Sequence, residues 1–375
     1  MIKLTNPLNA IFSRQAMLEQ HIAVFGESGS GKTTLLSTFF GWHDEYSFSK
    51  TNGYSLKAVD TSQGQELLCK YLKMKEEGHL PSPTRYQHDA FKFNINVRGL
   101  DKSAGSVVWH DYPGEWWTET KEDTENDRKV EAFQSLLQSD VAFFLCDAQR
   151  IKDEGNIYLR RLFKTFREEI ERQKNNLKSG DNHPNKFPRT WIICLSKADL
   201  MPDEDVYKFR NRVIKSVEDE LESLKEVIGG MMVGDGYKSI GEAFLLLSSA
   251  EIDPSTGKIE DASHPIGLDL IPPISIFLPI QNALDWERGK ANVQFTIHRL
   301  LETARSLTTN WAKYIPIVGS VLMLLDDAAK SGITELQKIE AKSRLKGDSA
   351  SVVIATFALK LKEEGTNKIY MSSEK

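Results

Sequence analysis

A glycine-rich octapeptide, GESGSGKT at residues 26–33, is the stretch of this sequence best suited to chemistry. Glycines let the backbone curl so that several N–H groups point at one spot, and the start of a following helix adds positive potential. Such a loop holds phosphates, with Lys32 reaching the β- and γ-phosphates and the Thr33 hydroxyl coordinating Mg²⁺. The nucleotide-binding residues predicted here are Gly26, Glu27, Ser28, Gly29, Ser30, Gly31, Lys32, Thr33 and Thr34.

A second candidate motif, DYPG, runs from Asp111 to Gly114 and closes an apolar run. A carboxylate at this place can hold Mg²⁺ through water, and a glycine three residues later can offer its N–H to the γ-phosphate. We therefore predict a metal role for Asp111 and a nucleotide contact for Gly114. Glu115 is a catalytic candidate that would orient or activate the attacking water, and the alternative is a solvated loop residue.

A third motif, SKAD at residues 196–199, follows another apolar run and predicts the base preference. Asp199 can accept two hydrogen bonds from guanine N1–H and its amine, a donor pair that adenine lacks, while the Lys197 stem covers the base. The alternative is a solvated loop in which Asp199 caps a helix. Ser249 and Ala250, after the last apolar run, are predicted to bring a backbone N–H to the guanine oxygen.

The elements around these motifs alternate between apolar runs and helical patterns. This order predicts an α/β fold, a mostly parallel six-stranded sheet with flanking helices. The expected strands are residues 21–25, 91–97, 106–111, 141–147, 191–196 and 243–248. The expected helices are residues 32–41, 60–75, 130–137, 157–174 and 205–227.

The domain organisation follows from the same pattern. We expect one domain over residues 1–308, with an insertion at 42–88, and a C-terminal helical extension over 309–375. A net charge of −5 over 375 residues gives no reason to expect nucleic-acid binding. The chain begins without the long apolar stretch of a secretory signal, so we expect a cytoplasmic protein.

In their order along the chain, these motifs resemble the Ras-like, translation-factor-related (TRAFAC) class of GTPases over roughly residues 20–250. The sequence DYPGEW around Asp111 is similar to that of a bacterial branch with the stress-associated YcjX-type proteins and the double-GTPase proteins of conflict gene clusters. The resemblance implies a P-loop GTPase fold, GTP as substrate, GDP as product and Mg²⁺ as cofactor. It also implies a switch of two loops that the γ-phosphate holds and hydrolysis releases. In this class the first residue of the base motif is usually Asn, where this chain has Ser196.

Such a switch needs a threonine ahead of the second strand, and Thr84 is the best placed to bring a hydroxyl to Mg²⁺. We predict metal and catalytic roles for Thr84, with a plain turn residue between prolines as the alternative. Arg85 could act in cis on the charge of the transition state. The two tryptophans at 116 and 117 suit a protein effector that would bind the switch region.

Two other classes of function stay open. The loop GESGSGKT is close to that of ABC-type ATPases, although the chain has no LSGGQ-like signature and the SKAD motif has no purpose in an ATP site. A nucleotide-gated assembly or membrane-contact module with slow turnover is the other alternative. Its basis is the apolar segment 315–325, which is too short to cross a bilayer, since that takes about 20 apolar residues.

Overall fold

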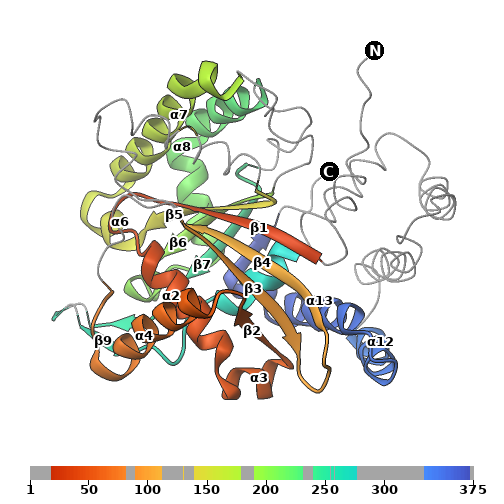
Figure 1. Ribbon diagram of the computed structural model, residues 1–375. Coiled ribbons are helices and arrows are strands. Elements are labelled where there is room, and N and C mark those ends of the chain that lie inside the picture. Colours follow the sequence, from red (N-terminus) through yellow and green to blue (C-terminus); the bar gives the residue numbers. More distant parts are fainter. Residues whose placement is uncertain are drawn as a thin grey trace, which may run out of the picture.

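An eight-stranded sheet with helices on both faces forms the centre of the computed structural model (Figure 1). The structure describes residues 18–81, 89–111, 130, 139–178, 190–230, 240–253, 255–256, 258–276 and 333–371. The strands lie in the order β10-β7-β6-β5-β1-β4-β3-β2. They are β1 (Leu18–Phe25), β2 (Tyr54–Ala58), β3 (Asp89–Val97), β4 (Ser103–Asp111), β5 (Val141–Asp147), β6 (Thr190–Ser196), β7 (Ala243–Leu247) and β10 (Ile369–Met371).

The five central strands β4, β1, β5, β6 and β7 are parallel to one another, and the others pair antiparallel at the two edges. The predicted mostly parallel sheet is therefore confirmed, and each of the six expected strands is present. The predicted strand count was wrong, because the sheet gains β2 from the expected insertion and β10 from the chain's C-terminal part. Both are edge strands, and β10 has only three residues, too few to show a period of two.

The burial of each strand follows its sequence pattern. Every residue of β5 and of β6 is buried, as expected for continuous apolar runs that are covered on both faces. In β3 the alternating residues Phe91, Phe93, Ile95 and Val97 are buried, and they face one side because successive strand residues point in opposite directions.

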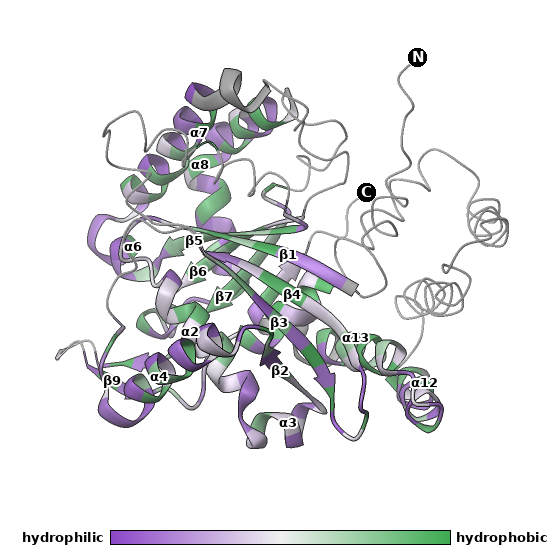
Figure 2. Cartoon of the chain, in the orientation of Figure 1, coloured by the Kyte–Doolittle hydropathy of each residue, from purple (hydrophilic) through white to green (hydrophobic). Residues whose placement is uncertain are grey.

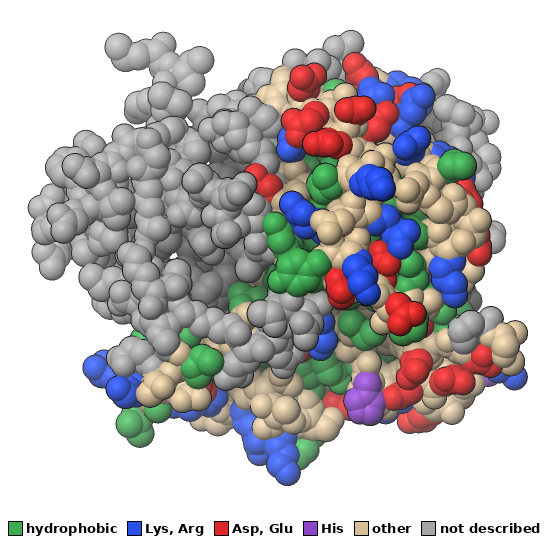
Figure 3. All heavy atoms as spheres, turned by 180° about the vertical axis from the view of Figure 1, so that it is seen from behind, with side chains coloured by type: hydrophobic (Ala, Val, Ile, Leu, Met, Phe, Trp, Pro, Cys, Tyr) green, Lys and Arg blue, Asp and Glu red, His purple; other side chains and the backbone are tan. Residues whose placement is uncertain are grey.

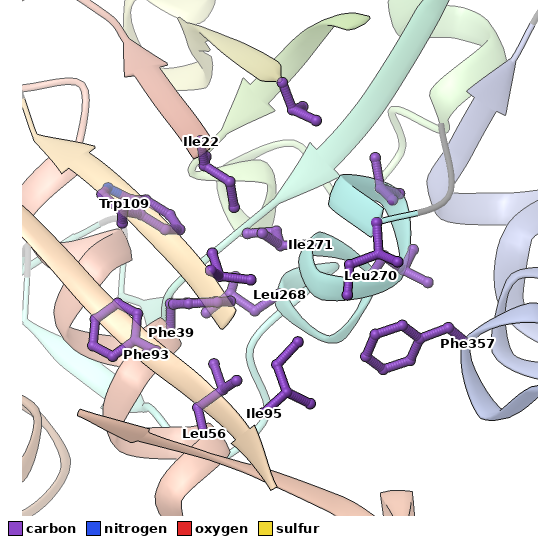
Figure 4. Close-up of a cluster of buried hydrophobic side chains, with 14 of the residues drawn as sticks. Ile22, Phe39, Leu56, Phe93, Ile95, Trp109, Leu268, Leu270, Ile271 and Phe357 are labelled. Carbon is purple, nitrogen blue, oxygen red and sulfur yellow. The ribbon is translucent and has the colours of Figure 1, made fainter. Parts of the chain in front are cut away.

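Two hydrophobic clusters lie on the two faces of the sheet. In β1, Ile22 and Val24 join one cluster, whereas Ala23 and Phe25 join the other. Figure 4 shows the first cluster, in which side chains of β2, β3, β4 and the helices α2 (Lys32–Asp44) and α13 (Ser349–Lys368) meet Leu268, Leu270 and Ile271. The helices are α2 (Lys32–Asp44), α3 (Tyr46–Asn52), α4 (Thr61–Glu77), α6 (Ala148–Glu154), α7 (Asn156–Lys178), α8 (Val206–Gly229), α12 (Ile333–Leu345) and α13 (Ser349–Lys368).

The second cluster joins α6, α7 and α8 to the opposite face of the sheet. Hydropathy mapped on the chain shows the same layering, with apolar strands between helices that carry polar residues on their outer sides (Figure 2). On the face in Figure 3, lysine and arginine side chains are interspersed with aspartate and glutamate side chains. This mixture fits a sequence whose 48 basic and 53 acidic residues nearly balance.

The C-terminal helix α13 packs directly on the sheet. Its Phe357 is fully buried and meets the ring of Tyr54 in β2 edge-on, with 5.0 Å between the ring centroids. The expected domain boundary at 308/309, the apolar segment 315–325 and most of the expected helix 130–137 lie outside the described residues. Among the helices that the structure does describe, none has both the length and the apolar character needed to cross a membrane.

A buried ion pair fastens α13 to the rest of the molecule. Lys360 Nζ lies 2.9 Å from Asp269 Oδ2, with side chains 12% and 8% exposed, and it also donates to Asn52 Oδ1 at 2.8 Å. Lys360→Met would leave the Asp269 charge buried and without this cation. We expect this change to lower the free energy of unfolding by about 3 kcal/mol, measured by urea denaturation.

The double variant Asp269→Asn/Lys360→Met tests the physical reason. It removes both charges, and we therefore expect it to be more stable than Lys360→Met alone. A double variant that unfolds at lower urea concentration than Lys360→Met would contradict the explanation that the buried Asp269 carboxylate needs the Lys360 cation.

Candidate nucleotide-binding site

A pocket of about 360 Å³ opens beside the carboxyl ends of the parallel strands. It lies where ligands bind in open α/β sheets. The loops after β1, β6 and β7 and the last residue of β4 all contribute to its wall. It brings together these predicted residues: Ser28, Gly29, Ser30, Gly31, Lys32, Thr33, Thr34, Asp111, Lys197, Asp199, Ser249 and Ala250.

Helix α2 begins at the pocket without a side-chain cap. Its N-cap residue is Gly31, which has φ 90° and no side chain to accept a bond from the first helical N–H groups. By contrast, aspartates at the N-caps of α4, α6, α8 and α13 accept such bonds. The N-terminus of α2 therefore offers its N–H groups and its positive potential to an anion in the pocket.

The loop before α2 is held together by hydrogen bonds from Lys32 to two of its carbonyl groups. Lys32 Nζ donates to the carbonyl oxygens of Gly26 at 2.7 Å and Glu27 at 2.9 Å. A Cβ at Gly26 would lie 2.3 Å from Ser30 Oγ and 3.1 Å from Leu145 Cβ, so this position needs glycine. Gly26 and Glu27 do not line the pocket themselves, and instead their carbonyls hold the lysine at its edge.

Thr33 and Asp111 supply oxygen atoms to the same pocket. Asp111 is the last residue of β4 and is 5% exposed. Within the described ranges no group of three or more histidine, cysteine or acidic side chains could hold a metal by itself. One hydroxyl and one carboxylate fit Mg²⁺, which usually keeps several waters and binds one or two carboxylates together with substrate phosphates.

Asp199 also lines the pocket, and two residues hydrogen-bond to its carboxylate. Ser248 Oγ donates to its Oδ1 at 2.5 Å, and the backbone N–H of Ile252 donates to its Oδ2 at 3.1 Å. Burial raises the pKa of Asp199, and these two hydrogen bonds oppose that rise. Ser248, which directly follows β7, and Ile252 of β8 (Glu251–Ile252) therefore orient the two oxygens, and each oxygen keeps a further lone pair for a donor.

The residues before Asp199 are fixed by β5. Lys197 has φ 55°, which is uncommon for a residue with a side chain, and its Nζ donates to Asp147 Oδ2 at 2.7 Å. Ser196, in place of the usual Asn, donates through Oγ to the Cys146 carbonyl at 3.3 Å. The serine therefore contacts the neighbouring strand.

Six residues singled out from the sequence are not placed by the structure. They lie outside the described residues and are Thr84, Arg85, Gly114, Glu115, Trp116 and Trp117. The pocket does include the residues just before the expected switch threonine, because Leu80 and Pro81 line it.

Sequence reasoning missed several residues at this site. Leu80, Pro81, Gln149 and Ile252 line the pocket, and Asp147 and Arg150 contact its loops from behind. The sequence does mark Asp147 in one way, because it is a charged residue at the end of an otherwise apolar strand. The apolar wall residues gave none, because their contribution depends on how α4 and β8 meet the loops.

Comparisons with known proteins give distant likenesses in structure. The chain is similar to an Era variant from Aquifex aeolicus, at 17% identity and TM-score 0.31, covering 69% of this chain and 56% of that one. It is also similar to the FeoB G-domain from Methanococcus jannaschii, at 14% identity and TM-score 0.26, covering 61% and 86%. The cytosolic domain of T. maritima FeoB gives 11% identity and TM-score 0.30, covering 93% and 98%.

The chain thus spans a little over half the length of the Era structure that it matches. No curated protein sequence matches it. A protein-family model gives a more specific match than these structures do. The model of the family Double-GTPase 2 matches residues 20–230, which is more than half of the chain. This match confirms the predicted resemblance to P-loop GTPases of the double-GTPase branch. The chain belongs to the Double-GTPase 2 family.

Proposed function

We propose that this protein binds GTP together with Mg²⁺, hydrolyses it to GDP and phosphate, and acts as a nucleotide-dependent switch. One observation carries the proposal. A single pocket of about 360 Å³ holds a phosphate-binding loop, an oxygen pair suited to Mg²⁺ and a carboxylate suited to guanine. An ATP site would need the first two of these features but not the third.

The phosphates would lie along the loop and the start of α2. Lys32 would turn from the loop carbonyls to the β- and γ-phosphates, and N–H groups of the loop would hold the phosphate oxygens. Thr33 and Asp111 would hold Mg²⁺, the aspartate through water. The metal would supply positive charge next to the phosphate that is transferred.

The base would lie between Lys197 and the residues after β7. Asp199 would accept bonds from guanine N1–H and the amine, since Ser248 and Ile252 orient its two oxygens without exhausting them. The Lys197 stem would cover the ring, and Ser249 or Ala250 would donate an N–H to the guanine oxygen.

The switch roles rest on the sequence. We propose that Thr84 joins the Mg²⁺ shell when GTP is bound, that Gly114 contacts the γ-phosphate and that Glu115 orients the attacking water. Arg85 could assist in cis. A protein effector would then bind residues 114–117 in one nucleotide state, in a cytoplasmic pathway that by resemblance concerns bacterial stress or phage defence.

Removal of the metal tests the hydrolysis part of the proposal. We expect the purified protein to release phosphate from GTP in the presence of Mg²⁺ and to lose at least about 100-fold of that rate in EDTA, because the metal neutralises charge on the reacting phosphate. Malachite-green phosphate detection measures the rate, and the heat-denatured protein is the control for free phosphate.

Three measurements separate the alternatives. Fluorescent mant-GTP is expected to bind more tightly than mant-ATP, and tighter ATP binding would instead indicate an ATPase. Light scattering and liposome flotation with GTP or GDP test the assembly and membrane-contact alternative. A large nucleotide-dependent signal with almost no phosphate release would favour that alternative over a hydrolytic switch.

A further inference from the structure

Glu27 is an acidic residue inside the loop that must hold a polyanion. It is 7% exposed, and only its backbone carbonyl takes part in holding Lys32. A carboxylate with so little access to water exerts a stronger field than an exposed one, because water screens it less. Its charge therefore opposes phosphate binding unless a nearby cation neutralises it.

Arg150 of α6 is that cation. Its NH1 donates to Glu27 Oε2, and its NH2 donates to the carbonyl oxygen of Ser28 at 3.1 Å. A second guanidinium, that of Arg161, lies 3.8 Å from the same carboxylate oxygen. Arg150 thus contacts two successive loop residues, one through its charge and one through the backbone.

A buried tyrosine supports both arginines. The Arg150 and Arg161 guanidinium carbons lie 5.9 Å and 5.6 Å from the centre of the Tyr158 ring, within the range of cation–π attraction. Tyr158 is fully buried, and burial raises its pKa, so the phenol stays neutral. Its hydroxyl accepts a bond from the backbone N–H of Asp147 at 3.1 Å.

Asp147 extends this set of contacts to the guanine end of the pocket. Its Oδ1 caps α6 by accepting from the Gln149 N–H at 2.9 Å, and its Oδ2 accepts from Lys197 Nζ at 2.7 Å. The start of α6 therefore contacts the base motif through Asp147 and the phosphate loop through Arg150.

We propose that Arg150 is a positioning residue for the phosphate-binding loop, which neutralises Glu27, holds the loop at Ser28 and so strengthens binding of the nucleotide's phosphates. The proposal rests on the GTP binding proposed above and adds a residue from outside the known motifs. Arg150 acts through Glu27 and the loop, so it needs no contact with the nucleotide.

Arg150→Met tests the proposal, because methionine keeps much of the side-chain volume and removes the charge. The Glu27 carboxylate would then lie beside the triphosphate without the Arg150 cation, and we expect the Kd for mant-GTP to rise about 10-fold, within the range of coupling between contacting residues. Arg167→Met is the matched control. Arg167 Nε donates to Glu220 Oε2 at 2.9 Å, a comparable pair between α7 and α8, and we expect this variant to bind GTP as the unaltered protein does.

The double variant Glu27→Gln/Arg150→Met distinguishes charge neutralisation from a direct arginine–phosphate contact. With the carboxylate gone, we expect its Kd to recover most of the loss caused by Arg150→Met. A double variant that binds as weakly as Arg150→Met would overturn the proposal, since the arginine would then act on the phosphates themselves. A merely structural arginine would lower the melting temperature without this recovery of affinity.

Arg150→Lys provides a second variant in case the methionine variant does not fold. Lysine keeps the positive charge but lacks the planar fork through which two nitrogens of Arg150 reach Glu27 and Ser28, so we expect a Kd increase of only about 3-fold by analogy with other coupled contacts. A Kd increase of about 10-fold or more in Arg150→Lys would overturn the charge argument. Absence of GTP binding by the unaltered protein would overturn the proposed function as well. Normal GTP binding that Arg150→Met leaves unchanged would overturn this inference alone.

Discussion

Replacing Asp199 by asparagine is expected to change the preferred nucleotide from GTP to XTP. The amide keeps one acceptor oxygen and replaces the other with a donor N–H₂ group. Guanine presents two donors and would face a mismatched amide, whereas xanthine has a carbonyl where guanine has its amine and would fit. Since a hydrogen bond to a charged group contributes about 1.5–3 kcal/mol, we expect GTP to bind about 10- to 150-fold more weakly.

Competition binding with mant-GTP against GTP, XTP and ATP measures this change. Asp203→Asn is the matched control, because Asp203 is an exposed residue four positions away in the chain that does not line the pocket, and it should leave the preference unaltered. If Asp199→Asn lowered the affinity for GTP, XTP and ATP equally, Asp199 would be a structural residue of the loop rather than the residue that reads the base.

Lys32→Ala is expected to have the largest effect on hydrolysis. The ammonium would stabilise charge that develops on the phosphates during transfer, and removal of one such group costs about 10²–10³-fold in kcat. Lys32 is nearly buried and its bonds to Gly26 and Glu27 close the loop, so GTP affinity should fall as well.

Single-turnover GTP hydrolysis and mant-GTP titration separate the two effects. Lys70→Ala is a suitable control, because Lys70 is a helical lysine of α4 whose ion pair with Glu66, at 2.6 Å, lies outside the pocket. Should Lys32→Ala hydrolyse GTP at the rate of the unaltered protein under saturating nucleotide, the assignment of this lysine to the transferred phosphate would be wrong.

The central part of the fold could be predicted from the sequence because its signals are local. The strands β5 and β6 are buried on both faces, so each is a continuous apolar run that needs no knowledge of its neighbours. Each motif directly follows such a strand, and carboxyl ends of parallel strands meet at one edge of a sheet. The order of the motifs therefore indicated one pocket, which the structure contains.

The edges of the fold could not be predicted in the same way. The strand β2 has five residues inside a segment expected to be an insertion, and it is a strand because β3 pairs with it. The strand β10 is shorter still and depends on β7. Likewise, the side of α13 that is buried depends on the position of Tyr54 and the residues near 269.

By itself, then, the sequence determined the central sheet and the glycine-rich loop before α2, and it predicted the choice of guanine, since these depend on residue types at short, fixed spacings. Tertiary structure alone decided how the site is supported. Glu27 and Arg150 are 123 residues apart, and Asp147 and Lys197 are 50 apart. No periodicity links such pairs, because their contact is produced only when parallel strands place the start of α6 beside both loops.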